Sequence, residues 1–333
     1  MTPAAHDSHV VAIIDALLKS DEPAVRWKVR SRVLDEDPES RPMVRLRNEI
    51  RRSPRVRTLM ECAAGASYRK WSGGHWVLIT LADIGYPPGD RELEPLAERV
   101  MQTWLAPRYY AEFETATSQY KQAAVPLMNG RYRRCGSQQG GALLAAVTLG
   151  VQTAAADRLV ERLLHWQWPD GGWNCSRKPT AATSSVYETL LPMRGLAAYA
   201  RVHRDAAARD ACDRAAEVLL TRRMLYRRTT GTLIRAEWAK LHYPSYWYYD
   251  VLSAAKGLAE ADLLGDDRCR DGLDLLESKR LPDGGWAAEG KYYNAPGARG
   301  QAEIVGWGGI NARKANEWVT VDALAVLHAG GRL

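Results

Sequence analysis

The chain of 333 residues contains a single phenylalanine, Phe113, beside 12 tryptophans and 15 tyrosines. Its five cysteines are widely spaced and form no Cys-x-x-Cys pair. An odd number of scattered cysteines argues against a disulfide framework. Apolar stretches such as residues 140–149 are much shorter than the roughly 18–20 residues of a membrane-spanning helix. The amino terminus has no charged segment followed by an apolar one, and we therefore expect a soluble, cytoplasmic protein without a membrane span.

The sequence also has few strand patterns. No alternating run of β-branched residues is long enough to predict a large sheet. The apolar content of 46% and the charged content of 26% are typical of a globular protein. A chain of this length suffices for one large domain or two ordinary ones. These features exclude a disordered or collagen-like chain and favour an all-α protein.

Residues 1–66 predict three or four short amphipathic helices. Val10, Ile13 and Leu17 recur at helical spacing, and breaks that contain proline separate this helix from the ones that follow. In length and pattern these helices resemble HEAT-type pairs. We interpret residues 1–66 as a helical extension that precedes the main domain.

From residue 67 onward, two kinds of helix alternate. Helices of the first kind carry almost no charge, whereas those of the second kind have one apolar and one charged face. A helix that is apolar all round must be buried on all sides, and a one-sided helix faces water. The alternation therefore predicts inner and outer helix layers over residues 67–333, as in an α/α toroid or a stacked α-solenoid. The predicted inner helices are 74–84, 140–149, 184–200, 246–259 and 316–329, and the outer ones are 93–105, 157–166, 210–222 and 267–279.

The same turn follows two of the outer helices. Residues 167–173 read Gln-Trp-Pro-Asp-Gly-Gly-Trp, and residues 280–286 read Arg-Leu-Pro-Asp-Gly-Gly-Trp. Proline fixes φ, aspartate caps and glycine supplies a positive φ, so the helix stops sharply and the chain reverses. The first copy matches the Gln-x-x-x-Gly-x-Trp repeat of the squalene-cyclase and protein-prenyltransferase β-subunit superfamily, and the second has Arg280 in place of glutamine. Residues 67–333 therefore resemble a terpenoid-cyclase-like α/α toroid at the level of the fold.

The resemblance implies a central cavity, lined by the ends of the inner helices and by the loops that precede them. The superfamily includes class II terpene cyclases, protein prenyltransferases and binding proteins. The Asp-x-Asp-Asp acid motif of the class II cyclases does not occur in this sequence, and the acidic cluster at 266–271 fits helix capping better. The zinc ligands of the prenyltransferases have no identifiable counterparts. The resemblance thus favours a related cyclase, isomerase or lyase and argues against squalene cyclisation itself.

The strongest candidate site is residues 241–250, which read Leu-His-Tyr-Pro-Ser-Tyr-Trp-Tyr-Tyr-Asp. Aromatic rings around Asp250 would exclude water from its carboxylate and raise its pKa, which suits a general acid or base. Glu188 and Asp322 are the expected partner carboxylates, because two carboxylates with separated pKa values can share proton-transfer roles. His242 is the fourth catalytic candidate. The expected substrate-binding residues lie at or near the starts of inner helices: Trp173, Tyr187, Tyr246, Trp247, Tyr249, Trp318, Gln138 and Glu317.

The same residues allow other interpretations. Asp250 could instead cap a helix within a packed core. Cys135, Cys175 and His242 lie in three successive loops and could form a zinc site, although local ligand spacing is missing; no other cofactor is expected. Either cysteine could also act as a nucleophile.

Basic residues gather between positions 26 and 57, where 11 lysines and arginines stand against 5 acidic residues; 11 − 5 gives +6 of the chain's net +7. Such a stretch could follow a nucleic-acid backbone, although the interleaved acids weaken its field. Two arginine-rich segments, 131–134 and 222–228, could hold an anionic group of a substrate.

The sequence therefore supports three functional hypotheses. The first is an enzyme that uses a central aromatic-lined cavity for proton-transfer chemistry, as a cyclase, isomerase or lyase. Its substrate would be small, partly hydrophobic and polar-edged, because tryptophan and tyrosine rings carry N–H and O–H groups. The second is a non-catalytic helical-repeat protein that binds nucleic acid or another protein. The third is a zinc-dependent transferase or hydrolase.

Overall fold

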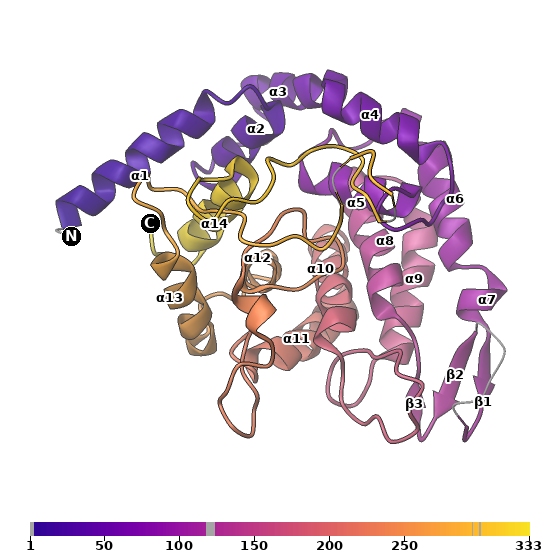
Figure 1. The fold of residues 1–333 in the computed structure, drawn as a ribbon. Coiled ribbons are helices and arrows are strands. Elements are labelled where there is room, and N and C mark those ends of the chain that lie inside the picture. The colour runs from indigo at the N-terminus through magenta and orange to yellow at the C-terminus, as the bar shows by residue number, and fades with distance from the viewer. Residues whose placement is uncertain (1–2, 118–123, 295, 300) are drawn as a thin grey trace.

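The computed structural model describes residues 3–117, 124–294, 296–299 and 301–333 and is mostly helical (Figure 1). Within those residues it contains fourteen α-helices and one small three-stranded sheet. The predicted all-α class is confirmed as a mostly helical fold. The small sheet is consistent with the prediction that no large sheet is present.

Four helices come first in the chain; α1, α3 and α4 lie along the upper edge of the molecule in Figure 1, and α2 lies beneath α3, toward α14 (Glu317–Ala329). Proline stands in the first turn of α2, α3 and α4, where its fixed φ and missing N–H suit a helix start. These prolines lie in the breaks that the sequence predicted. The helices are α1 (Pro3–Leu18), α2 (Pro23–Arg32), α3 (Arg41–Arg52) and α4 (Pro54–Ala63).

The predicted alternation of two helix kinds is present in the rest of the chain. Nine of the ten residues of α5 are buried, whereas α9 buries five of its fourteen. The buried helices are α5 (Gly74–Asp83), α8 (Gly136–Leu149), α10 (Val186–His203), α12 (Val251–Glu260) and α14 (Glu317–Ala329). The one-sided helices are α6 (Glu94–Trp104), α9 (Thr153–Trp166), α11 (Ala206–Leu220) and α13 (Arg270–Ser278).

The buried helices pack against one another in chain order. Helix α5 packs against α8, α8 against α10, α10 against α12, and α12 against α14. Helix α14 then packs against α2, and the Lys28 ammonium of α2 lies 2.7 Å from the Asp83 carboxylate at the end of α5. Helix α2, from the predicted extension, therefore belongs to the same packed core.

The connection between α6 and α8 contains the small sheet. Strand β1 (Glu112–Glu114) pairs in parallel with β2 (Val125–Met128), and β2 pairs antiparallel with β3 (Arg131–Tyr132). The short helix α7 (Pro107–Tyr110) precedes β1. Three single-turn 3-10 helices complete the described elements: Arg91–Leu93, Ala236–Ala239 and Asp267–Cys269.

Helix α12 begins later than the sequence predicted. The expected start was residue 246, but the helix starts at Val251, because Asp250 is its N-cap. The Asp250 carboxylate accepts a hydrogen bond from the backbone N–H of Ser253 at 2.7 Å, and the Ser253 hydroxyl accepts one from the Asp250 backbone N–H at 2.9 Å. This reciprocal capping satisfies two N–H groups at the start of the helix. Asp250 thus lies at the end of a loop and not within a helix.

The two Pro-Asp-Gly-Gly-Trp turns adopt the same structure. Gly171 and Gly284 have φ values of +97° and +88°, as the predicted chain reversal requires. In each copy, the residue before the proline donates its N–H to the carbonyl of the second glycine at 2.8 Å. Each copy therefore ends an outer helix and returns the chain toward the next buried helix.

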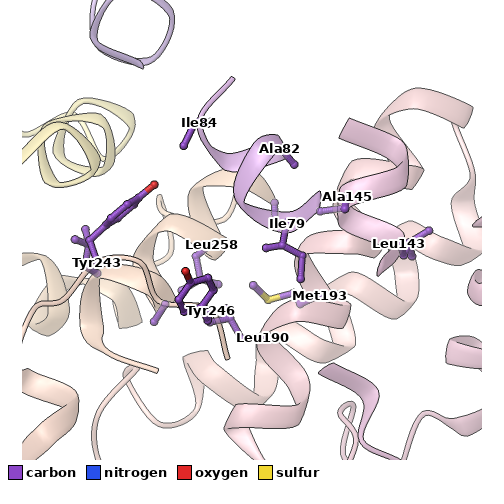
Figure 2. Close-up of a cluster of buried hydrophobic side chains, with 14 of the residues drawn as sticks. Ile79, Ala82, Ile84, Leu143, Ala145, Leu190, Met193, Tyr243, Tyr246 and Leu258 are labelled. Carbon is purple, nitrogen blue, oxygen red and sulfur yellow. The ribbon is translucent and has the colours of Figure 1, made fainter. Parts of the chain in front are cut away.

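The closest approach between buried helices lies where α8 crosses α10. A methyl group placed on Gly140 of α8 would lie 2.3 Å from the backbone nitrogen of Pro192 in α10, and one on Gly195 would lie 2.7 Å from the Gly140 carbonyl oxygen. Figure 2 shows side chains of α5, α8, α10 and α12 gathered around this core, with Ile79 and Met193 among them. The small residues at the crossing let these helices approach backbone to backbone.

We expect Gly140→Ala to lower the free energy of unfolding by about 1–3 kcal/mol, because overpacking forces helices apart. The added methyl group would meet backbone atoms, which cannot rotate away. Urea unfolding followed by circular dichroism measures the change. Gly265→Ala is the matched control, since a methyl group there meets no atom within 4 Å. Equal stability of the two variants would contradict this packing argument.

Candidate functional site

A cavity of about 400 Å³ lies between the buried helices, within the roughly 300–1,000 Å³ usual for small-molecule sites. Apolar side chains such as Ile79, Leu144 and Leu252 form part of its wall. The loop that precedes α12 also lines it, through residues 242–246. Polar lining groups come from two sets, a histidine–aspartate pair and a cluster of charged residues.

The histidine–aspartate pair consists of His242 and Asp250. Nδ1 of His242 lies 2.6 Å from Oδ2 of Asp250, and both side chains are at most 1% exposed. The same oxygen accepts the backbone N–H of His242 at 3.1 Å. The Nδ1 contact is poorly aligned for a linear hydrogen bond, and Nε2 has no hydrogen-bond partner among the described residues. A buried imidazole next to a carboxylate, with its second nitrogen unpartnered, has the arrangement of a general base and its orienting acid.

The charged cluster consists of Lys28, Asp83, Lys256 and Asp322, which come from α2, α5, α12 and α14. The Lys28 Nζ lies 2.7 Å from Asp83 and 3.0 Å from Asp322. The Lys256 Nζ lies 2.7 Å from Asp322 and also contacts Asp83. Each ammonium thus joins both carboxylates. The Tyr243 hydroxyl donates to the Asp83 carboxylate at 2.7 Å, which ties the loop before α12 to the charged cluster.

The cluster sets the charge states of its members. Burial acts to raise the pKa of Asp83, but the nearby Lys256 and Lys28 ammonium groups hold it well below its usual value. The pKa of Asp322 is lowered for the same reason, also against the effect of burial. Burial lowers the pKa of Lys28, and the two carboxylates oppose that effect. Both carboxylates therefore remain charged at neutral pH.

Further arginines line the same cavity beside this cluster. Arg194 of α10 forms a two-point ion pair with Glu260, at 2.6 and 2.8 Å. Arg32 of α2 lies 3.8 Å from Asp322. Together with Lys256, these groups give the cavity a charged lining beside its apolar side chains. A small molecule that carries both polar groups and a hydrophobic part fits such a lining.

A second group of chemically active side chains lies at the starts of α8 and α10. Cys135, Cys175 and Glu188 each place one ligand atom within 4.8 Å of the others. Glu188 is buried, and burial raises its pKa, although hydrogen bonds from Ser137 act in the opposite direction. The hydrogen bond to Cys135 is the main cause that raises the pKa of the Cys175 thiol. Burial and the neighbouring Glu188 raise it further.

The structure separates the predicted catalytic residues into two groups. His242, Asp250 and Asp322 line the cavity, although Asp322 contacts the two lysines and not Asp250. Glu188 lies with the cysteines instead. The predicted zinc set changes in the same way, because Cys135 and Cys175 are grouped with Glu188 and His242 contacts Asp250.

The predicted substrate-binding residues are likewise divided. Tyr246 lines the cavity. The others make structural contacts. Two pairs of rings stack: Tyr187 on Trp247, with ring centroids 4.6 Å apart, and Trp318 on Tyr243. Four residues form hydrogen bonds: Tyr249 donates to the Met224 carbonyl, Trp173 donates to the Leu163 carbonyl, Gln138 accepts from the Arg134 guanidinium, and the exposed Glu317 accepts from the Ser20 hydroxyl.

Four residues of the site were missed by sequence reasoning: Lys28, Asp83, Arg194 and Lys256. Tyr243 lay within the predicted segment 241–250 but was given no role of its own. The signal was clearest for two of the four. Asp83 is the single charged residue of α5, at its last position, and Lys256 is the single charged residue of α12 apart from the terminal Glu260. A lone charge within a fully buried helix needs a partner of opposite charge. Applied to each inner helix, that rule would have selected Asp83, Lys256 and Asp322, together with Glu188 and Arg194 of α10.

The basic amino-terminal stretch is largely paired with acids. Six arginines between residues 26 and 55 have a carboxylate partner: Arg26 with Glu49, Arg30 with Glu36, Arg32 with Asp322, Arg47 with Glu39, Arg51 with Asp90 and Arg55 with Glu22. Lys28 is buried in the charged cluster. These pairings reduce the positive field that a nucleic acid would recognise.

Comparisons with known proteins add no family to this description. No protein-family model, curated protein or solved structure matches the chain. Among the described residues, no helix has the length and apolar character needed to cross a membrane. The residues of the site therefore carry the functional argument.

We expect Lys28→Met to lower the free energy of unfolding by about 3–5 kcal/mol, because removing one partner of a buried ion pair leaves charge uncompensated. Lys28 is fully buried and contacts both carboxylates of the cluster. Thermal and urea unfolding measure the loss. Lys19→Met, at an exposed position of the same region, is the matched control and should leave stability unchanged. A similar stability for both variants would show that the cluster does not join α2 to the core.

Proposed function

We propose that the protein is an enzyme that uses His242 for proton transfer within the cavity, in the manner of a cyclase, isomerase or lyase. The substrate would be a small molecule with a hydrophobic body and a polar end. The observation that carries this proposal is the buried pair of His242 and Asp250, both of which line the cavity. Nothing else among the described lining residues combines an unpartnered imidazole nitrogen with an adjacent carboxylate.

In this mechanism His242 accepts a proton from the substrate through Nε2 and returns it to another atom. Asp250 lies beside Nδ1 and stabilises the imidazolium that forms, while the backbone N–H of His242 keeps the carboxylate in place. Asp250 is itself fixed by the capping contacts with Ser253. The loop that carries His242 therefore cannot move without breaking the N-cap of α12. This restraint keeps His242 and Asp250 in the geometry that catalysis needs.

The charged cluster supplies the polar end of the site. Lys256 and Arg194 line the cavity, and their side chains are 12% and 9% exposed. They would bind a carbonyl or carboxylate of the substrate and stabilise negative charge that develops when a proton is removed. The apolar wall formed by Ile79, Leu144 and Leu252 would hold the hydrophobic body.

The arrangement of helices supports an α/α toroid as part of the same proposal. The buried helices pack in chain order from α5 to α14, and α2 contacts both α14 and Asp83 of α5. The matching turns at Gly171 and Gly284 agree with the resemblance to the terpenoid-cyclase and prenyltransferase superfamily. Fold analogy does not fix a reaction, so the catalytic assignment rests on His242 and Asp250.

The first test uses the solvent proton. A library of small metabolites is incubated with the purified protein in D₂O, and mass spectrometry detects compounds that gain deuterium or are converted. We expect such a compound with the wild type and none with His242→Gln, because glutamine cannot take up a proton. His203→Gln, at an exposed histidine, is the control and should retain the activity. Exchange that persists in His242→Gln would contradict the assignment.

The second test separates the chemical role of Asp250 from its capping role. Asparagine caps a helix as well as aspartate does, so Asp250→Asn should keep the cap on Ser253. It removes the charge beside His242 and also the oxygen that accepts the His242 backbone N–H. We expect the rate on the compound identified above to fall by about 10²–10⁴-fold, as loss of acid–base catalysis usually does. Circular dichroism and thermal unfolding verify the fold. A wild-type rate in a folded Asp250→Asn variant would reduce Asp250 to a capping residue.

A further inference from the structure

The cysteine–glutamate group is built from three separate segments. Cys135 is the N-cap residue of α8, Cys175 follows the Trp173 turn, and Glu188 lies in the first turn of α10. Their Sγ and carboxylate oxygen atoms all lie within 4.8 Å of one another. The Cys175 Sγ is 3.6 Å from Oε1 of Glu188. Convergence of three metal-ligating side chains from distant parts of the chain requires the folded state and is not a product of local sequence.

The two oxygens of Glu188 have different roles. Oε2 accepts the backbone N–H of Ser137 at 3.2 Å and its hydroxyl at 2.6 Å. Oε1 faces Cys175 instead. Hydrogen bonds to one oxygen of a carboxylate orient the other toward a metal, as residues around metal ligands commonly do. Ser137 therefore holds Glu188 in the position that a ligand needs.

The charges around the group can compensate a divalent cation. Among the described residues, no lysine or arginine forms an ion pair with Glu188. The nearest buried cation is Arg134, whose guanidinium donates to Gln139 at 2.9 Å and to Gln138 at 2.8 Å rather than to the acids. Once a metal has displaced the two thiol protons, two thiolates and one carboxylate would carry −3, which Arg134 (+1) and a divalent ion (+2) would balance. A buried set of charges is stable only when it is compensated in this way.

We propose that Cys135, Cys175 and Glu188 bind one zinc ion. Tetrahedral zinc with bonds of about 2.3 Å to sulfur and 2.0 Å to oxygen separates a sulfur and an oxygen ligand by about 3.5 Å, close to the 3.6 Å between Cys175 and Glu188. Two thiolates select zinc over magnesium or calcium, which prefer oxygen ligands. The two thiols release their protons to solvent on binding.

Three protein ligands leave the fourth position of the zinc for water or a small ligand, as in catalytic zinc sites. Cys135 and Cys175 are both partly exposed, whereas Glu188 is buried. The ligand set differs from the one that the sequence suggested, because Glu188 replaces His242. The site is also independent of the His242–Asp250 pair, so that the failure of either proposal leaves the other standing.

The test uses the full-length protein, reduced and freed of metal, and then titrated with Co²⁺ in the absence of oxygen. We expect one equivalent to bind and to give the intense visible bands of tetrahedral cobalt together with a thiolate-to-cobalt charge-transfer band in the near ultraviolet. Zinc should displace the cobalt and abolish both signals, and metal analysis of the purified protein should give one zinc per chain. A titration without a thiolate band would overturn the proposal.

Variants assign the ligands. Cys135→Ser and Cys175→Ser should each remove or weaken the charge-transfer band, and Glu188→Gln, which can still accept from Ser137, should weaken cobalt binding at least about tenfold. Cys62→Ser, at an exposed cysteine, is the control and should bind cobalt as the wild type does. Circular dichroism verifies that each variant is folded. Wild-type cobalt binding by a folded Cys135→Ser/Cys175→Ser double variant would refute the site. A wild-type protein that contains a Cys135–Cys175 disulfide and still fails to bind cobalt after reduction would also refute it.

Discussion

The fold depends on one buried set of charges, in which Lys28 and Lys256 each lie between Asp83 and Asp322. These four residues come from α2, α5, α12 and α14, so the first and last parts of the chain meet there. A single hydrophobic contact could be replaced by another of similar size, but a buried charge must find its own counter-charge. The cluster therefore fixes which helices are neighbours and not merely that they are packed.

The same cluster positions the candidate active site. Tyr243 donates its hydroxyl to Asp83, and it directly follows His242 in the loop before α12. Asp250 ends that loop by capping α12. The imidazole is thus held between a hydrogen bond to the charged cluster on one side and a helix cap on the other. Stability and the proposed catalysis share these residues, which explains why a strongly charged group is retained in a core that could have been apolar.

The sequence predicted features that depend on local physics. The alternation of uncharged and one-sided helices follows from which faces meet water, and the turns at Gly171 and Gly284 follow from backbone sterics. The sequence analysis recognised Asp250 but placed the start of its helix too early, at residue 246. The aromatic residues before Asp250 do not mark clearly where the helix begins. The capping contact with Ser253 decides that boundary.

Contacts between distant segments were beyond sequence reasoning. Lys28 and Asp322 are separated by 294 positions, and no periodicity relates them. Glu188 was predicted as a partner of Asp250, but the start of α10 lies beside the start of α8, which brings Glu188 to Ser137 and the cysteines. A single sequence shows which residues are chemically able to act in a site. It does not show which of them lie next to one another in the folded protein.

The preference for tryptophan over phenylalanine is explained better by hydrogen bonds at the ends of helices than by the lining of the cavity. The tryptophan of each matching turn donates its ring N–H backward to the preceding outer helix: Trp173 to the Leu163 carbonyl at 3.1 Å, and Trp286 to the Leu276 carbonyl at 2.7 Å. Carbonyls in the last turn of a helix have no partner within the helix. A phenylalanine ring could fill the same volume but could not donate this hydrogen bond. At Leu163 it would leave the carbonyl buried and unpaired, at a cost of about 1–3 kcal/mol, whereas the Leu276 carbonyl would keep the backbone N–H of Lys279 as a partner at 3.2 Å. In a fold built from many short helices, each with an end to satisfy, rings that both pack and donate are the better choice.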